Sequence, residues 1–154
     1  MEIERKFLAD TGPDLEGCES SAIEQGYLAL ADDEGGAEVR LRQRDDELTL
    51  TVKSAGGEVR EEEEIELERD EFDRLWRLTE GRRVEKTRYV IPHDGLEIEL
   101  DIYAGELEGL RVAEVEFEDE DEAGSFEPPG WFGQEVTGKR EYLNETLATE
   151  GLPR

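Results

Sequence analysis

The chain opens with the stretch Glu2-Ile3-Glu4-Arg5-Lys6-Phe7, in which Glu2, Glu4 and Lys6 occupy alternate positions. Successive side chains of a β-strand point to opposite faces of a sheet, so residues two apart share a face. Two carboxylates and one ammonium ion are therefore predicted to lie on the same face of the first strand.

The same alternation recurs in five further segments, each with two charges of one sign separated by a single residue. The pairs are Arg40 and Arg42, Glu62 and Glu64, Lys86 and Arg88, Glu99 and Asp101, and Glu114 and Glu116. Carboxylates that share a face repel each other, and a divalent cation relieves that repulsion. Clustered arginine and lysine side chains favour a polyanion. The pattern therefore predicts a site for a metal ion and a polyanion, if these faces point inward.

The alternative is an ordinary solvated surface, because any half-exposed antiparallel strand also alternates apolar and polar residues. If the charged faces point outward, the interior is an ordinary core and the chain has no evident site. Lysine usage favours the inward arrangement. The chain has only four lysines, of which Lys6, Lys53 and Lys86 lie on these strand faces while Lys139 does not. Lysine is thus kept where the pattern predicts a need for an ammonium ion.

The length and charge of the chain limit its partners. The 154 residues are predicted to form a single domain, 1–154, with a net charge of −26 from 44 acidic and 18 basic residues. Nucleic acids and anionic membranes are polyanions and are excluded as partners on this ground. Abundant Asp and Glu with scarce Lys is typical of a halophilic protein, because concentrated salt screens self-repulsion. An acidic protein from an ordinary host is the alternative.

The cellular location is predicted from what the sequence contains. Cys18 is the single cysteine, so no internal disulfide can form and a reducing cytoplasm fits. The sequence shows no apolar run of membrane-spanning length and no signal-peptide pattern at its start. We expect a cytoplasmic protein. The oligomeric state is left open, with a homodimer as one alternative.

The hydrophobic periodicity predicts a mainly β fold of the α+β class, an eight-stranded antiparallel closed β-barrel with a few covering helices. One helix is predicted to begin with Asp70 as its N-cap and a second with Thr137 as its N-cap. Turn signals lie at 45–46, 55–58 and 92–95. The strands are expected near residues 2–9, 22–30, 37–45, 47–54, 59–68, 82–91, 96–104 and 110–118.

Taken in order, the charged motifs resemble those of the CYTH domain family, also called triphosphate tunnel metalloenzymes, which opens with Glu-x-Glu-x-Lys. The resemblance covers essentially the whole chain. It implies an eight-stranded antiparallel tunnel with charges inside, which binds a triphosphate with Mg²⁺ or Mn²⁺. The matching segments are Glu2–Lys6, Gln25–Leu28, Val39–Arg42, Leu50–Lys53, Glu62–Ile65, Glu80–Tyr89, Glu99–Asp101 and Ala113–Phe117.

By motif position, the resemblance also implies a role for each charged strand residue. The implied metal ligands are Glu2, Glu4, Glu114 and Glu116, with Asp101 as a helper. The implied triphosphate-binding cations are Lys6, Arg40, Arg42, Lys53, Lys86, Arg88 and Lys139. Catalytic contributions are implied for Glu2, Glu4, Lys6 and Lys86, and for Glu62 and Glu64, which would serve a second metal ion or position the water. Tyr27 is implied as a residue that orients a neighbouring charge.

The implied activity is hydrolysis of a triphosphate by a metal-activated water. The chain resembles the short bacterial triphosphatase branch through Glu80–Tyr89 and Trp131-Phe132-Gly133. Inorganic tripolyphosphate, cleaved to pyrophosphate and phosphate, is therefore the expected substrate. The alternatives are a thiamine- or nucleoside-triphosphatase, a class IV-type adenylate cyclase, and a polyphosphate-binding module without turnover. Trp76, Trp131 and Phe132 are expected to pack helices on the barrel rather than to stack on a base.

Overall fold

One eight-stranded sheet organises the chain. The computed structural model describes residues 3–10, 12–31, 35–54 and 61–153. The strand order is β1-β8-β7-β6-β2-β3-β4-β5, and all seven neighbouring pairs are antiparallel. The strands are β1 (Ile3–Leu8), β2 (Glu19–Ala29), β3 (Ala37–Arg44), β4 (Glu47–Ser54), β5 (Glu62–Glu66), β6 (Arg83–His93), β7 (Leu96–Tyr103) and β8 (Arg111–Phe117). All eight predicted strands are present, with ends shifted by a few residues.

Two of the predicted turns form as expected. The β6–β7 hairpin turns at Asp94 and Gly95, whose φ angles are 48° and 81°. Positive φ at both central residues is the requirement of a two-residue hairpin turn that matches the twist of the strands. The β3–β4 connection places Asp45 at φ 52°. The predicted turn at 55–58 lies outside the described residues.

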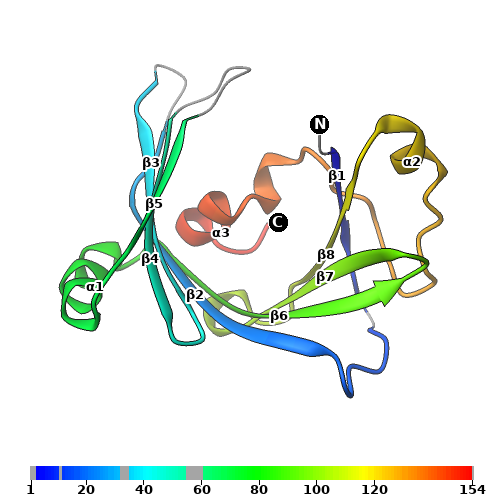
Figure 1. Cartoon of the computed structure of the whole chain (residues 1–154), viewed down its shortest axis with the longest axis horizontal. Coiled ribbons are helices and arrows are strands. Elements are labelled where there is room, and N and C mark those ends of the chain that lie inside the picture. Colours follow the sequence, from blue (N-terminus) through cyan, green and yellow to red (C-terminus); the bar gives the residue numbers. More distant parts are fainter. Residues whose placement is uncertain (1–2, 11, 32–34, 55–60, 154) are drawn as a thin grey trace.

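The prediction of a closed barrel is wrong, because the sheet curves but stays open. Figure 1 shows β1 and β5 on opposite sides of the curve, and no ladder joins the described residues of these two edge strands. The edge of β1 is covered by the C-terminal segment, since Leu8 N–H donates to Gln134 O and Val136 N–H donates to Lys6 O. Alternation specifies which face a residue occupies, whereas closure depends on strand tilt and stagger, which alternation does not encode.

In the described ranges, three α-helices and three short 3₁₀ segments accompany the sheet. They are α1 (Arg69–Trp76), α2 (Glu120–Ser125), α3 (Asn144–Glu150), η1 (Arg77–Thr79), η2 (Gly105–Leu107) and η3 (Arg140–Tyr142). The two predicted N-caps are wrong. Glu68 caps α1, and its N–H donates to the Glu71 carboxylate at 2.8 Å. The Thr137 hydroxyl instead accepts from Lys6 N–H, and α3 begins after Leu143. Within the described residues, no helix combines the length and apolarity needed to cross a membrane.

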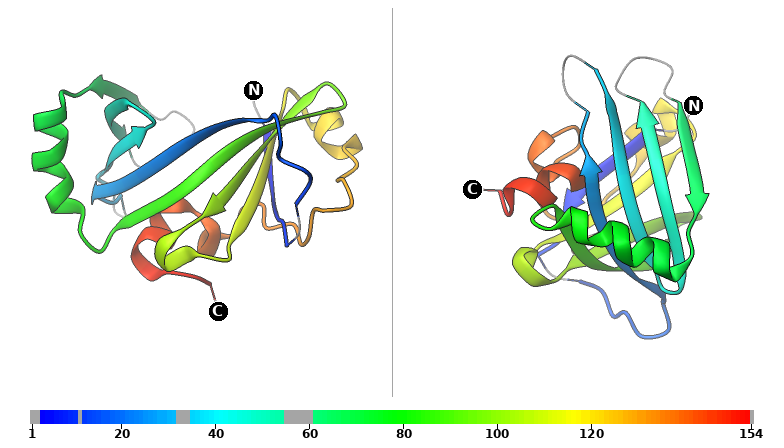
Figure 2. Two further views of the ribbon diagram at one scale, coloured as in Figure 1. Left: turned by 90° about the horizontal axis from the view of Figure 1, so that it is seen from below. Right: turned by 90° about the vertical axis from the view of Figure 1, so that its left-hand side faces the viewer.

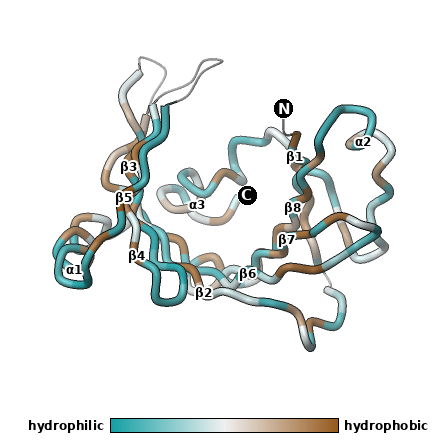
Figure 3. The backbone as a smooth tube through the Cα atoms, viewed as in Figure 1, coloured by the Kyte–Doolittle hydropathy of each residue, from teal (hydrophilic) through white to brown (hydrophobic). Residues whose placement is uncertain are grey.

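The two faces of the sheet carry different cores. On the convex face, Phe72 of α1 packs with Leu41 and Leu48, and Trp76 joins that cluster. A second convex cluster, around Ile98, Val115 and Phe117, contains Trp131 and Phe132. These three aromatic residues therefore pack in the convex clusters, as expected. The hydropathy tube of Figure 3 shows polar and apolar positions alternating along the strands.

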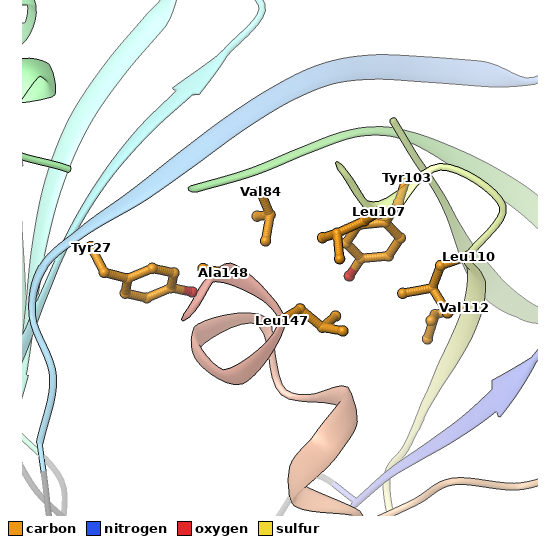
Figure 4. Packing of buried hydrophobic residues seen from close by; sticks show 8 residues of the cluster. All are labelled: Tyr27, Val84, Tyr103, Leu107, Leu110, Val112, Leu147 and Ala148. Atoms are coloured by element: carbon orange, nitrogen blue, oxygen red, sulfur yellow. The ribbon is translucent and has the colours of Figure 1, made fainter. Parts of the chain in front are cut away.

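Helix α3 lies inside the curve of the sheet, on the concave face. Figure 1 and the two views of Figure 2 agree on this placement and put α1 on the outside. Leu147 and Ala148 of α3 pack with side chains from β2, β6, β7, η2 and β8, seen in Figure 4. Those side chains are Tyr27, Val84, Tyr103, Leu107, Leu110 and Val112. Because these strand residues mark the concave face, every residue an even number of positions away on the same regular strand shares it.

Candidate functional site

Strand register gathers the charged pairs on the concave face. Lys6 lies opposite Glu114 across β1 and β8, and Glu114 lies opposite Glu99 across β8 and β7. On the other side of the curve, Tyr27 lies opposite Arg40 and Gln25 lies opposite Arg42. Since Tyr27 packs against α3, the predicted inward arrangement of the charged faces is confirmed for these strands.

Four glutamates form what we call the carboxylate group: Glu4, Glu99, Glu114 and Glu116 on β1, β7 and β8. Burial raises the pKa of Glu4, and Glu114, Glu116 and Glu99 raise it further while Lys6 opposes them. The strand register places these carboxylates side by side, since Glu4 lies opposite Glu116 and Glu114 lies opposite Glu99. Oxygen ligands of this kind suit a hard divalent cation. Glu2, the remaining predicted ligand, lies outside the described residues, and the part of the chain that is described holds no preformed cluster of three metal-ligating side chains.

The cations nearest this group are bound by carboxylates. Lys6 Nζ lies 3.2 Å from Glu114 Oε1 and donates to the carbonyl oxygen of Tyr142 at 3.3 Å. Arg88 Nη1 lies 2.9 Å from Glu99 Oε2. Each of these side chains is thus fixed, and its charge is largely balanced within the protein.

Asp101 has a different environment from the one predicted for a metal helper. It is only 3% exposed. Lys86 Nζ donates to Asp101 Oδ2 at 2.8 Å, and Arg88 donates to Asp101 through Nε at 2.8 Å and Nη2 at 3.0 Å. Burial alone would raise its pKa, but Lys86 and Arg88 together hold the pKa of Asp101 below its ordinary value. Three charge-assisted hydrogen bonds make Asp101 the anchor of two cations.

Two of the β3 arginines, Arg42 and Arg44, have neutral partners instead. Arg42 Nε donates to Gln25 Oε1 at 2.9 Å, and Arg44 Nε donates to Ser21 Oγ at 3.3 Å. Arg40 Nε is buried and has no hydrogen-bond partner among the described residues. None of the ion pairs that join described residues includes these three arginines. Burial lowers the pKa of Arg42 to about 10, with the charges of Arg40, Arg88 and Arg44 acting in the same direction. This row is suited to bind a polyanion.

The remaining predicted residues lie around this site with weaker contacts. Lys53 is half-buried on β4 and lies opposite Glu62 of β5. Thr51 Oγ1 donates to Glu64 Oε1 at 3.5 Å, and both glutamates are exposed. Lys139 is exposed in the turn before η3, where its backbone N–H donates to Val136 O. The structure does not bring Lys139 into the strand register that aligns the other cations.

Three residues of the concave face were absent from the predicted set: Gln25, Arg44 and Glu99. Arg44 continues the alternation of Arg40 and Arg42, and Glu99 shares a face with Asp101. Strict period two already placed Glu99 in the charged pattern, although no role was assigned to it, and it could also have found Arg44. Gln25 shares a face with Tyr27, but its side chain is uncharged, so a pattern defined by charged residues did not identify it.

Comparisons with known proteins agree with this geometry. The family model described as "CYTH domain" matches residues 1–146. An inorganic triphosphatase of Nitrosomonas europaea is 50% identical over 149 residues, covering 96% of each chain. An inorganic triphosphatase of Acetivibrio thermocellus is 36% identical, covering 95% of this chain and 92% of that one. The crystal structure of the inorganic triphosphatase NE1496 superposes with a TM-score of 0.84 at 45% identity, covering 99% of this chain and 97% of that one.

Proposed function

The chain belongs to the CYTH domain family, and on this premise we propose that it hydrolyses inorganic tripolyphosphate to pyrophosphate and phosphate on the concave face of its sheet. One observation carries the proposal. The carboxylate group and the β3 arginines, of which Arg42 and Arg44 have neutral partners, share a single face and lie on its two sides. A metal ion bound by the carboxylate group and a triphosphate bound by the arginines would balance each other's charge.

The residues present fit a divalent cation, and we assign Mg²⁺ or Mn²⁺ to the carboxylate group. Glu4, Glu114 and Glu116 would hold the ion, with Glu99 beside them and Glu2 expected to join them. The raised pKa of Glu4 supports this assignment, because burial raises it and the nearby carboxylates of Glu114, Glu116 and Glu99 raise it further. When bound, the ion would supply positive charge to phosphate oxygens and a water of lowered pKa.

The chain's own cations would position the substrate. Phosphoryl transfer depends mainly on alignment and on neutralising developing negative charge, with little covalent chemistry left for the protein. Arg40, Arg42 and Arg44 would bind non-bridging phosphate oxygens from β3. Lys86 and Arg88, fixed by Asp101, would form a rigid edge of the site beside them.

The inorganic substrate is favoured over a nucleotide or thiamine ester by the position of the aromatic residues. Trp76, Trp131 and Phe132 pack in the convex clusters, away from the concave face. Tyr27 and Tyr103, which do lie on the concave face, pack with Leu147 and Ala148 of α3. The described part of the site therefore offers a triphosphate charged partners and offers a base no open stacking surface.

The proposed setting is the cytoplasm, where the half-buried thiol of Cys18 stays reduced. The net charge of −26 supports a small anion, delivered with metal ions, rather than a nucleic acid or membrane as the partner.

The test is a substrate panel with initial rates of phosphate release. The panel holds inorganic tripolyphosphate, pyrophosphate, long-chain polyphosphate, ATP and thiamine triphosphate, each with Mg²⁺, Mn²⁺ or EDTA. We expect tripolyphosphate to give the highest kcat/KM, and EDTA to abolish the reaction until metal is restored. Faster turnover of ATP would overturn the substrate assignment, and equal rates in EDTA would overturn the metal assignment.

A further inference from the structure

Gln25 is a fully buried glutamine, 0% exposed, in the middle of β2. Its side-chain oxygen accepts from Arg42 Nε at 2.9 Å, and its side-chain nitrogen donates to Tyr27 Oη at 2.6 Å. The guanidinium of arginine can only donate, so the atom facing Arg42 must be the amide oxygen. The amide nitrogen is then directed to Tyr27, whose hydroxyl oxygen accepts. Both ends of the Gln25 amide are thus fixed by their partners.

Arg42 needs such a partner because its surroundings repel it. Arg40, Arg44 and Arg88 all act on its guanidinium as like charges. A side chain with several rotatable bonds would swing away from such a cluster unless a contact held it. The bond to Gln25 uses only Nε. No described residue accepts from the two terminal nitrogens of Arg42, so both remain available for an oxyanion.

The partner of Arg42 is an amide rather than a carboxylate, and this difference decides whether the charge of Arg42 is balanced. Asp101 holds Lys86 and Arg88 by ion pairs and so balances their charge. Gln25 holds Arg42 by a neutral oxygen, which fixes the guanidinium without cancelling it. A hydrogen bond to a charged group is also stronger than one between neutral groups, so a single contact can hold this side chain.

We propose that Gln25 is a positioning residue for triphosphate binding, which holds the Arg42 guanidinium through Nε, with Tyr27 fixing the orientation of the Gln25 amide. The inference rests on the proposed function and deepens it, because it names how the arginine row is kept ready for the substrate. Gln25 itself does not touch the triphosphate. Its effect is transmitted entirely through Arg42.

The first experiment compares steady-state kinetics for tripolyphosphate in Gln25→Leu and in a matched control. Loss of one hydrogen bond to a charged group should raise KM about tenfold in Gln25→Leu, with a much smaller change in kcat. The control is Gln43→Leu on the convex face of β3, where Gln43 Oε1 likewise accepts from an arginine, Arg69, at 3.3 Å. This control should keep the wild-type KM. A KM for Gln25→Leu within about twofold of wild type, well below the effect of such a hydrogen bond, would overturn the inference.

Two further variants separate the contact from the charge. Gln25→Glu keeps an acceptor beside Arg42 but balances its charge, so KM should rise at least as much as in Gln25→Leu. Tyr27→Phe removes only the partner of the amide nitrogen, so KM should rise less. Tyr27→Phe also keeps the proposal testable if Gln25→Leu fails to fold. A KM for Gln25→Glu equal to that of wild type would contradict the claim that a neutral partner keeps the charge of Arg42 available.

A double-mutant cycle tests whether the effect passes through Arg42. In an Arg42→Ala background, Gln25→Leu should cause little further rise in KM, because the side chain it positions is gone. A full and independent effect in that background would overturn the inference. Calorimetry of tripolyphosphate binding in EDTA tests the role of Gln25 separately from the proposed hydrolysis, because it requires no turnover. A wild-type protein that does not release phosphate contradicts the proposed function, whereas equal affinities of wild type and Gln25→Leu contradict the role of Gln25.

Discussion

The two sides of the concave face hold their cations in opposite ways. On the side formed by β1, β6, β7 and β8, Lys6, Lys86 and Arg88 are paired with carboxylates at 2.8 to 3.2 Å. On the side formed by β2, β3 and β4, Arg42 is held by the amide of Gln25 and Arg44 by the hydroxyl of Ser21. We call these the carboxylate side and the arginine side.

The difference shows that the charge of the partner decides what a cation can do. A lysine bound to a buried aspartate is part of the scaffold, because removing it leaves a buried charge with fewer partners. An arginine bound to a neutral oxygen keeps its full attraction for a ligand. A count of basic residues on the face does not distinguish these roles, whereas the identity of each hydrogen-bond acceptor does.

The largest expected effect is the difference in unfolding free energy between Lys86→Met and Arg42→Met. Methionine keeps a long unbranched side chain in both variants. Lys86→Met should lower the free energy of unfolding by about 3 kcal/mol, because it breaks a buried ion pair to Asp101. Arg42→Met should cost less, about 1 kcal/mol, because the loss of the hydrogen bond to Gln25 is partly offset by relief of the repulsion from the neighbouring arginines. Urea unfolding in EDTA measures both. Equal losses of unfolding free energy in the two variants would contradict the distinction between the carboxylate side and the arginine side.

The next effect concerns substrate binding on the arginine side. Arg42→Ala should lower kcat/KM for tripolyphosphate by about thirty-fold, or about 2 kcal/mol, as expected for the loss of one charge-assisted contact. The change should fall mainly on KM. Arg77→Ala, at an exposed position of η1, removes the same charge far from the site and serves as the control. Wild-type kinetics in Arg42→Ala would contradict the assignment of the arginine side to the substrate.

A smaller effect is expected from Glu4→Gln on the carboxylate side. The pKa of Glu4 is raised above 4.5, so its charged form is disfavoured in the folded state. This cost is present at neutral pH and disappears as the pH falls through the raised pKa. In EDTA at pH 7, Glu4→Gln should raise the melting temperature by about 2 °C, a small effect because solvent screens this half-exposed group.

The control for Glu4→Gln is Glu24→Gln, which removes the same charge from an exposed position on the convex face of β2. The control should leave the melting temperature nearly unchanged. The difference between Glu4→Gln and wild type should shrink on acidification, and added Mg²⁺ should stabilise Glu4→Gln less than wild type. A destabilised Glu4→Gln variant in EDTA would show that Glu4 is not held in a repulsive group.

Much of the fold was predictable because period-two alternation is local. It located all eight strands and the hairpin at Asp94 and Gly95. Closure of the sheet was not predictable, because the pairing of β1 with 134–136 depends on a segment far along the chain. The N-cap of α1 was missed for a local reason, since the Glu68–Glu71 capping box competes with Asp70 for the same helix start. Thr137 was misassigned for a long-range reason, since its hydroxyl accepts from Lys6 N–H of β1.

The sequence predicted which charged residues share a face of the sheet, but it did not predict which of them contact each other. Alternation placed Arg42, Lys86 and Asp101 on one surface, yet it does not show which side chains meet across strands. The contact of Lys86 with Asp101 spans 15 residues, and that of Gln25 with Arg42 spans 17. These long-range contacts decide that Asp101 anchors cations and that Arg42 keeps its charge available.

A thermal-shift matrix of metal against substrate analogue tests the central claim that both sides form one site. Mg²⁺ and a non-hydrolysable triphosphate analogue are varied together at fixed ionic strength. Mg²⁺ alone leaves the arginine side without an anion, and the triphosphate analogue alone leaves the carboxylate side without a metal ion. Both ligands together balance the charge of the whole face. A ligand that binds only the folded state stabilises it by mass action. We expect the shift with both ligands to exceed the sum of the two separate shifts. Strictly additive shifts would contradict the central claim, because the metal and the triphosphate would then occupy independent sites.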